Sequence, residues 1–578
     1  MALNIYQKIE RGYPKVNARK LTSVMLAAML AAVTILAGCS QGDNGKNAEP
    51  SSSAPAASSP SASQPASEEA APDYWQVGSE PLEFSMYHHY NWSDAPEWES
   101  TPFGRYAKEK LQVNVVPIKA SGNHEQKLNT MIADGKLPDV IWGDRGANVE
   151  RLREAGMLVP LDDYVEKYPN LRKWLNKETL NMLRSPDGKL YTFPNWYNDE
   201  PYGNAGYLVN KKIYDELGAP PLETTDDLYN YLKMVKEKYG NEIIPFEPHL
   251  AKDLHGIGLL YTAFEENALY WYLGNQMRAI PRGDKLTSVL VDPAFRESQK
   301  YVAKLYREGL MTQDAMTQTL DQITEKVTTG RVAVYAGSSP TTVGMTAQIE
   351  LEKQGHPGYF MTWPIHKPGL DRNKIFPGSY ATLGWNAAVI TTSAKDPEKI
   401  FAFLDWMTGS EGHAILHYGP EGEMWQGFDD EGYPNFTDKL DVQKAAEIEG
   451  ENNNVWWVGN AKLNDRGKVK AQQQLPPEKR SWIAKIQTEV SWPTQADHTA
   501  FVNLNPNPDT EEGIIRQAID DIFNETLART LMAKSDAEVD EILDKAEKDA
   551  QSAGYDRLLQ WRTEQWHKNL EIMNGNFE

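Results

Sequence analysis

The sequence predicts an α/β protein with two globular lobes. Between residues 82 and 142, predicted strands and a helix follow one another in βαβ order, which is typical of parallel sheets. About 505 residues follow the first 73, more than a single hydrophobic core usually supports. Short strands and amphipathic helices recur towards the C-terminus, so both lobes should belong to the same class.

The first predicted strand covers residues 82–87, where apolar and polar side chains alternate, and it runs into the polar and aromatic stretch 88–92. A second strand is predicted over 113–118, a helix over 125–133 and a third strand over 139–142. Ligands bind outside the carboxyl ends of strands in open α/β sheets. Residues 87–92 and 142–144 should therefore lie on one rim.

Later segments predict further strands and helices. Strands are expected over 189–193, 331–335 and 382–390. Asp396 and Pro397 predict the start of a helix that carries apolar side chains as far as Met407. Ser535 predicts the N-cap of another helix, and a final amphipathic helix carries Trp566.

The N-terminus has the order of a secretory signal, with basic residues up to Lys20 and then an apolar stretch over 21–36. This stretch has about 16 residues, fewer than the roughly 20 of a spanning helix. It ends in Leu36-Ala37-Gly38-Cys39, which resembles the lipobox of bacterial lipoproteins. We expect residues 1–38 to be removed and Cys39, the single cysteine, to be acylated.

Residues 39–73 are rich in Ser, Ala and Pro and have almost no large apolar side chains. Such a segment buries too little surface to offset its ordering entropy, so a disordered tether is predicted. Its root-mean-square reach is roughly 30 Å, enough to hold a domain over residues 74–578 clear of a membrane. The expected location is the extracytoplasmic face of a cell membrane, held there by the acylated Cys39.

Net charge and aromatic content limit the partners. A formal net charge of -22 disfavours nucleic acid and anionic lipid surfaces. The chain nevertheless contains 17 Trp and 27 Tyr, many for a polar sequence. We therefore expect aromatic surfaces on which a ligand stacks, and no nucleic-acid partner.

Several motifs occur together along the chain and resemble one family. They are NTMIADGKLPDV at 129–140, AGMLVPLD at 155–162, DGKLY at 187–191, GYLVNKK at 206–212, AKDPEK at 394–399 and DWM at 405–407. In this order they are similar to the family 1 extracellular solute-binding proteins, which include maltose-binding protein, and most of all to their large Gram-positive lipoproteins. The resemblance covers nearly the whole chain beyond the tether.

The resemblance implies a periplasmic-binding-protein type II fold, with a hinge and a ligand cleft between two lobes. It places lobe 1 at about 78–195 and 325–378 and lobe 2 at about 200–322 and 382–578, with crossings near 195–205, 320–330 and 375–385. It also implies a monomer without cofactors that captures a mono- or oligosaccharide and delivers it to the permease subunits of an ABC importer. Hinge closure around the ligand is expected.

A carbohydrate cleft needs aromatic platforms for sugar C–H faces and polar side chains for hydroxyls. Candidate ligand-binding residues follow predicted strands or lie near predicted crossings: His88, His89, Asn91, Trp92, Trp142, Asp144, Trp196, Tyr197, Tyr202, Asn204, Trp363, Tyr380, Trp385, Glu423 and Trp425. Trp406, Trp561 and Trp566 lie in amphipathic helices and are expected to pack. The nearest cations in sequence, Arg145, Arg184 and Lys189, are few, which favours a neutral or weakly acidic ligand.

The sequence suggests three other interpretations. A metal at His88 and His89 is disfavoured because neighbours on a strand point to opposite faces and no third ligand follows at a suitable spacing. Asp199-Glu200 and Glu421 with Glu423 suggest a secreted glycoside hydrolase with paired carboxylates. No hydrolase motif accompanies them, so an enzyme is not expected. A surface adhesin or sensor that binds sugars without transport stays open.

Overall fold

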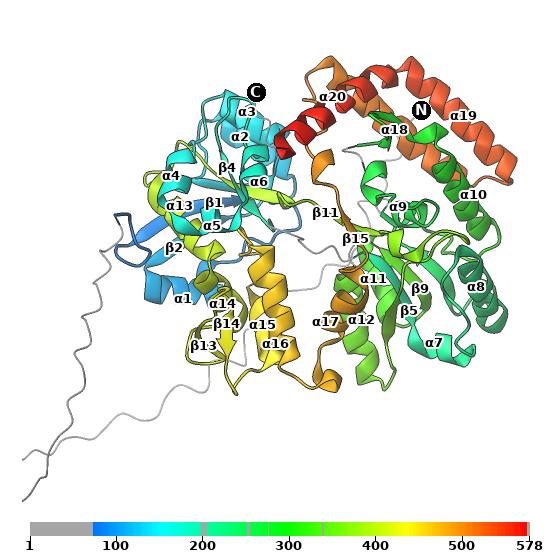
Figure 1. The fold of residues 1–578 in the computed structure, drawn as a ribbon, viewed down its shortest axis with the longest axis horizontal. Helices are drawn as coiled ribbons and strands as arrows, with labels where there is room; N and C mark the ends of the chain where they lie inside the picture. The colour runs from blue at the N-terminus through cyan, green and yellow to red at the C-terminus, as the bar shows by residue number, and fades with distance from the viewer. Residues whose placement is uncertain are drawn as a thin grey trace, which may run out of the picture. The chain divides into compact units, whose positions relative to one another are not determined.

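The computed structural model describes residues 73–197, 205–250, 255–274, 277–337, 340–452 and 454–574. Two main sheets form the centre of this part of the chain, and helices pack on both faces of each (Figure 1). The predicted signal sequence, Cys39 and nearly all of the tether lie outside these residues. Within the described ranges, no helix is long and apolar enough to cross a membrane.

The first sheet has five strands in the order β2-β1-β3-β12-β4. β1 pairs in parallel with β2 and β3, whereas β12 runs antiparallel between β3 and β4. The strand bounds are β1 (Leu82–His88), β2 (Val113–Ile118), β3 (Val140–Asp144), β4 (Thr192–Asn195) and β12 (Asn386–Ile390).

Both faces of this sheet are buried. Phe84 and Met86 of β1 join one core, while Tyr87 joins the core on the other face. This is the alternation that a strand imposes on successive side chains. The helices and strands around it are α1 (Pro102–Leu111), α2 (His124–Ala133), α3 (Ala147–Glu154), α4 (Asp162–Lys167), α5 (Pro169–Trp174), α6 (Lys177–Met182), α13 (Pro397–Thr408), α14 (Ser410–Tyr418), the hairpin β13 (Trp425–Phe428) and β14 (Pro434–Phe436), α15 (Val442–Glu451) and α16 (Gly467–Gln473).

The second sheet has four strands in the order β10-β5-β9-β6. β9 pairs in parallel with β6 and antiparallel with β5, which in turn pairs antiparallel with β10. The strand bounds are β5 (Gly206–Asn210), β6 (Ile244–Pro248), β9 (Val332–Gly337) and β10 (Tyr359–Thr362).

This sheet also has a core on each face. Tyr207 and Val209 of β5 join the larger core, and Leu208 joins the smaller one. The helices around it are α7 (Lys211–Glu216), α8 (Thr225–Tyr239), α9 (His255–Thr262), α10 (Pro293–Arg307), α11 (Leu320–Thr328), α12 (Pro340–Lys353), α17 (Trp482–Ile486), α18 (Glu511–Leu531), α19 (Asp536–Ser552) and α20 (Tyr555–Met573), with the hairpin β7 (Ala279–Arg282) and β8 (Lys285–Ser288).

A short parallel pair of strands lies where the chain passes from one sheet to the other. β11 (Gly378–Tyr380) precedes β12 of the first sheet, and it pairs with β15 (Gln495–Asp497), which precedes the helices α18 to α20. Two connecting segments, more than a hundred residues apart in sequence, are thus hydrogen-bonded to each other. The backbone N–H of His498 extends this contact by donating to the carbonyl of Tyr380 at 2.7 Å.

The predicted division of the chain between lobes is wrong in two segments. Residues 325–378 were assigned to the first lobe, but β9 and β10 within them pair with β5 and β6 of the second sheet. Residues from 382 onwards were assigned to the second lobe, but β12 completes the first sheet and α13 packs in its core. No crossing occurs near 320–330, because α11 and β9 contact the same core.

The predicted elements themselves agree closely with the observed ones. The helix expected over 125–133 is α2, which begins one residue earlier because the Asn123 side chain accepts a hydrogen bond from the Gln126 N–H. The helix after Asp396 is α13, and Ser535 caps α19. The strand expected over 382–390 begins only at Asn386, because Gly384 takes a positive φ of 70° in the preceding turn.

Candidate functional site

Four aromatic rings gather at the rim of the first sheet, where β1 and β3 end and β12 begins. Tyr90 stacks on Trp92 with ring centroids 4.8 Å apart and an interplanar angle of 28°. Trp385 lies 5.7 Å from Tyr90 and 6.3 Å from Trp92, tilted by about 40° to each. Trp142 packs edge-on behind them. We call Tyr90, Trp92, Trp142 and Trp385 the rim cluster.

The two outer rings of the rim cluster face solvent. Trp92 is 57% exposed and Trp385 is 49% exposed, whereas Trp142 is 2% exposed and Tyr90 is 7% exposed. Large aromatic side chains normally bury most of their surface. Tyr90 and Trp142 therefore support the rings of Trp92 and Trp385, which are exposed to solvent.

Polar groups border the rim cluster. The Tyr90 hydroxyl donates to Asp144 Oδ1 at 2.6 Å, and the Asp144 side chain is otherwise exposed. Burial and the neighbouring Asp144 carboxylate together raise the pKa of the Tyr90 hydroxyl, so it stays a donor. Asn91, next to Trp92, is exposed and accepts a hydrogen bond from the His124 N–H at 3.0 Å. A carboxylate and an amide thus lie beside exposed aromatic faces.

Gly384 sets the position of Trp385. A Cβ at residue 384 would lie 1.9 Å from the carbonyl oxygen of Asn195, a separation that no side chain permits. One guanidinium nitrogen of Arg145 donates to the Gly384 carbonyl at 2.5 Å. The turn before β12 is therefore fixed between the ends of β3 and β4.

Trp196 lies at the end of β4 with a positive φ of 60° and is half-buried. Its ring lies 5.3 Å from that of Trp456, tilted by 33°, and the backbone N–H of Trp196 donates to the Gly459 carbonyl at 2.7 Å. A non-glycine residue in this conformation is strained and is held by its surroundings. Trp196 and Trp456 form a second aromatic pair at this end of the sheet.

The two predicted histidines diverge, as neighbours on a strand must. His88 is 1% exposed, its Nδ1 is 2.7 Å from Ser93 Oγ, and burial lowers its pKa to about 4. His89 points to the other face, where its Nε2 lies 3.5 Å from Glu125 Oε1. His88 supports the rim from within the core and is not exposed to a ligand.

Three other predicted ligand-binding residues serve the core or the outer surface of the first lobe. Tyr197 is fully buried, and its hydroxyl bonds Thr408 Oγ1 at 2.7 Å. Trp425 is 1% exposed and donates to the Gly419 carbonyl. Glu423 is exposed and pairs with Lys444 at 3.1 Å. The glycine-punctuated sequence around 420–424 resembles a binding loop, but it is a turn that leads into the hairpin of β13 and β14.

Trp363 and Tyr380 do not join the rim cluster. Trp363 follows β10 of the second sheet, where it packs against Arg372 and donates to its carbonyl. Tyr380 lies on β11 in the connection between the sheets. Tyr202 and Asn204, with Asp199 and Glu200, lie outside the described residues. Arg184 bonds Asp162 and Gly188, away from the rim.

Sequence alone did not single out Tyr90 or Trp456. Tyr90 alternates with His88 and Trp92 in the run after β1, so its position two residues from each was the available signal. Trp456 is followed by Trp457, and only the fold shows that the first contacts Trp196 while the second is 2% exposed. The arrangement as a whole suits stacking and hydrogen bonding.

The family of bacterial extracellular solute-binding proteins matches residues 92–414. One curated relative is the polygalacturonan/rhamnogalacturonan-binding protein YtcQ of Bacillus subtilis, 24% identical over 312 residues, which are 52% of this chain and 58% of the relative. The melibiose/raffinose/stachyose-binding protein MelE of the same organism is 23% identical over 314 residues, 50% of this chain and 63% of the relative. The alignments thus span less than two thirds of either relative.

Solved structures share the fold over nearly their whole length. The substrate-binding protein FusA of Streptococcus pneumoniae, in complex with kestose, superposes with a TM-score of 0.61 at 17% identity, covering 85% of this chain and 99% of that one. The alginate-binding protein AlgQ2 gives a TM-score of 0.57 at 20% identity, covering 86% and 100%. These likenesses confirm the predicted two-lobed α/β fold. With more than half of its length matched by the family, the chain belongs to the bacterial extracellular solute-binding proteins.

Proposed function

We propose that this chain captures a mono- or oligosaccharide outside the cell and delivers it to an ABC importer, and that acylated Cys39 anchors it to the membrane. The observation that carries the proposal is the rim cluster, in which Trp92 and Trp385 present exposed ring faces beside Asp144. Family membership supports solute binding rather than catalysis. The curated relatives are named for binding oligosaccharides or polysaccharides.

The chemistry of the rim fits a sugar. Pyranose and furanose rings have C–H faces that pack on indoles, while their hydroxyls need acceptors and donors such as the carboxylate of Asp144 and the amide of Asn91. Trp92 and Trp385 are tilted by 39° to each other, so they offer two platforms to neighbouring sugar units rather than a single stack. Closure of the two lobes would then enclose a ligand bound at this rim.

The charges at the rim favour a neutral sugar. Asp144 is an exposed carboxylate and would repel a uronate, while the guanidinium of Arg145 is engaged with the Gly384 carbonyl. We therefore expect neutral oligosaccharides to bind more tightly than uronate oligomers of equal length.

Calorimetric titration of the chain against matched neutral and uronate oligosaccharides tests this proposal. We expect saturable binding of a neutral oligosaccharide, weaker binding of its acidic counterpart, and no new products when the same mixtures are separated by chromatography. Absence of binding across neutral and acidic panels would contradict carbohydrate capture. Product formation would support the hydrolase interpretation, in which Asp199 with Glu200 or Glu421 with Glu423 supply the carboxylate pair.

Uptake and membrane attachment are tested separately in cells. A strain that lacks the chain should import the labelled ligand again when the wild type is restored, but not when Trp92 and Trp385 are both replaced by Ala. Binding without any effect on import would favour the adhesin or sensor. Cys39→Ser should abolish acyl labelling and move the protein from the membrane fraction to the medium.

A further inference from the structure

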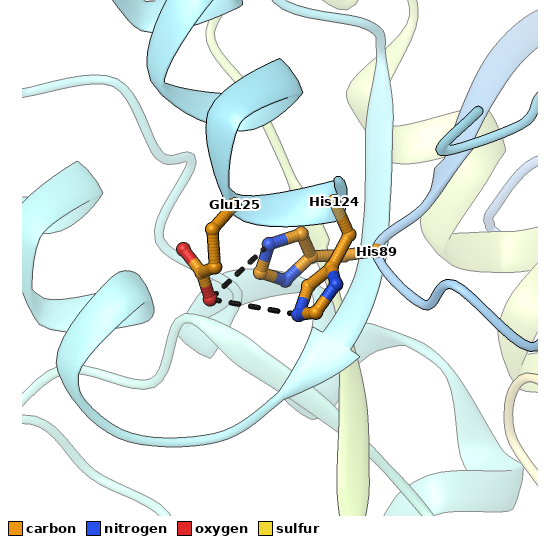
Figure 2. A group of neighbouring side chains, drawn as sticks. All are labelled: His89, His124 and Glu125. Carbon is orange, nitrogen blue, oxygen red and sulfur yellow. Dashed lines mark ion pairs between the residues drawn. The ribbon is translucent and has the colours of Figure 1, made fainter. Parts of the chain in front are cut away.

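Two histidines and one glutamate from separate elements converge beneath the rim. His89 follows β1, whereas His124 and Glu125 form the start of α2 (Figure 2). One side-chain ligand atom from each residue lies within 4.8 Å of the other two. The three side chains point towards one another in Figure 2, and none belongs to the rim cluster.

The distances among these atoms suit a shared metal ion. His89 Nε2 lies 3.5 Å from Glu125 Oε1, and His124 Nε2 lies 3.8 Å from the same oxygen. Two ligands of a tetrahedral zinc, each about 2.0–2.1 Å from the metal, are roughly 3.3 Å apart. The three ligand atoms all lie within 4.8 Å of one another, so side-chain rotations that draw them closer together would bring them to that spacing.

The His89 side chain is buried and positioned as the imidazole of a metal ligand would be. It is 95% buried (5% exposed), and its Nε2 makes no hydrogen bond within the described residues. A Cβ on Gly143 would come within 3.1 Å of the His89 ring, so the glycine makes room for the imidazole. A buried polar atom without a hydrogen bond costs about 1–3 kcal/mol, which a metal–nitrogen bond would offset.

The other two ligands are supported by the surrounding structure. The Asn148 amide donates to Glu125 Oε1 at 3.0 Å, in the way that outer hydrogen bonds orient metal-bound carboxylates. The backbone of His124 is fixed at both ends, because its N–H donates to Asn91 and its carbonyl accepts from the Tyr87 hydroxyl. The remaining side-chain face is open, since His124 is 32% exposed and Glu125 is 49% exposed.

We propose that His89, His124 and Glu125 bind one divalent transition-metal ion, with zinc the best match. Two imidazoles and one carboxylate are ligands that zinc prefers, whereas calcium and magnesium take oxygen ligands. Three protein ligands leave a fourth position, which the exposed side of the cluster makes available to water. The ion would join the loop that carries Asn91 and Trp92 to α2.

Zinc titration of the full chain, without a polyhistidine tag and after chelator treatment, tests the proposal. We expect one tight zinc site per chain, weakened at least about 10-fold in both His124→Ala and Glu125→Gln. Cobalt bound at the same site should give the visible absorption bands of tetrahedral coordination. His567→Gln is the matched control, because it removes an exposed histidine from α20 and should leave the titration unchanged.

The alternative is a simple His89–Glu125 ion pair, and it predicts different results. Zinc would then not bind tightly, or it would bind equally well to the His124→Ala and Glu125→Gln variants, and either result overturns the proposal. Displacement of zinc by an equal concentration of calcium would also overturn it. Circular dichroism of the metal-free variants verifies that they are folded, so that lost binding reports on the site. The measurement requires no sugar and is independent of the proposed function.

Discussion

The first lobe contains two groups of tryptophans that differ only in what surrounds them. In the rim cluster, Trp92 and Trp385 are about half exposed. In the core, Trp457 is 2% exposed, stacks on Trp98 with centroids 5.6 Å apart, and donates to a backbone carbonyl. The core indoles are covered by protein, whereas Trp92 and Trp385 leave about half of their surface uncovered. Residue type therefore does not distinguish a tryptophan that can stack on a ligand from one that packs in the core. The exposed area of its ring does.

The largest expected effect lies in the core. Trp457→Ala should lower the free energy of unfolding by about 3–5 kcal/mol, because it removes a buried ring and leaves a cavity. Urea unfolding followed by circular dichroism measures the change, with Trp92→Ala as the exposed counterpart, expected to change by less than about 1 kcal/mol. Equal losses in the two variants would break the distinction between core and rim.

His88 lies between the two groups, 5.3 Å from the Trp142 ring and 6.0 Å from the Trp457 ring. Burial lowers its pKa to about 4, so the neutral form is favoured in the folded chain. Its contribution to stability is present above about pH 6.5, the unfolded pKa, and is lost as the pH falls towards 4.

His88→Gln should therefore remove up to about 3 kcal/mol of the acid-induced loss of stability between pH 6.5 and 4. The measurement is the difference between wild-type and variant unfolding free energies across this range. The wild type keeps some pH dependence in either case, because burial also lowers the pKa of His413 and His498 to about 3. An unchanged slope in the variant would show that His88 does not titrate in this way.

Trp385→Ala tests the rim itself. We expect about a 10-fold weaker affinity for the sugar identified by calorimetry, or about 1.4 kcal/mol, with little change in unfolding free energy. Trp566→Ala is the control, because this indole is 9% exposed and packs on Phe501 in the larger core of the second sheet. A folded Trp566→Ala variant with the same loss of affinity as Trp385→Ala would remove Trp385 from the proposed site.

The smallest effects come from single hydroxyl groups. Tyr90→Phe removes the donor to Asp144 and should weaken sugar binding by roughly two- to threefold, or about 0.5 kcal/mol. Tyr197→Phe leaves Thr408 Oγ1 without its partner and should lower stability by about 1 kcal/mol with no effect on binding. Calorimetry and urea unfolding on both variants measure this contrast, and an exchange of the two outcomes would contradict it.

Local sequence was a good guide to the elements and a poor guide to their partners. Alternation over 82–87 predicted β1, and Asp396-Pro397 predicted α13, because these signals lie within a few residues of the element. The lobes of β9 and β12 were assigned from the family resemblance, and that assignment failed because strand pairing depends on hydrogen bonds between segments far apart in sequence. The residues of β9 and β12 do not themselves indicate which sheet each strand joins.

The same limit explains the candidate site. Trp92, Trp142 and Asp144 were predicted from their positions after strands, and Trp385 from its place near a predicted crossing; the fold brings all four to one rim. Trp425 was predicted from glycine-rich surroundings, which describe a hairpin equally well. His124 and Glu125 were not paired with His89, because the 34 residues between His89 and His124 separate them in sequence and only the packing of α2 beside β1 brings them together.

Gly384 has a wider consequence than its own turn. Its missing side chain lets the backbone before Trp385 rest directly on the backbone of Asn195 and Trp196, so one point of contact sets the spacing of both indoles. A methyl group at residue 384 would push the turn before β12 away from the end of β4 and so separate the two aromatic pairs. The absence of a Cβ at residue 384 thus sets the distance between the two aromatic pairs, and with it the width of the aromatic surface.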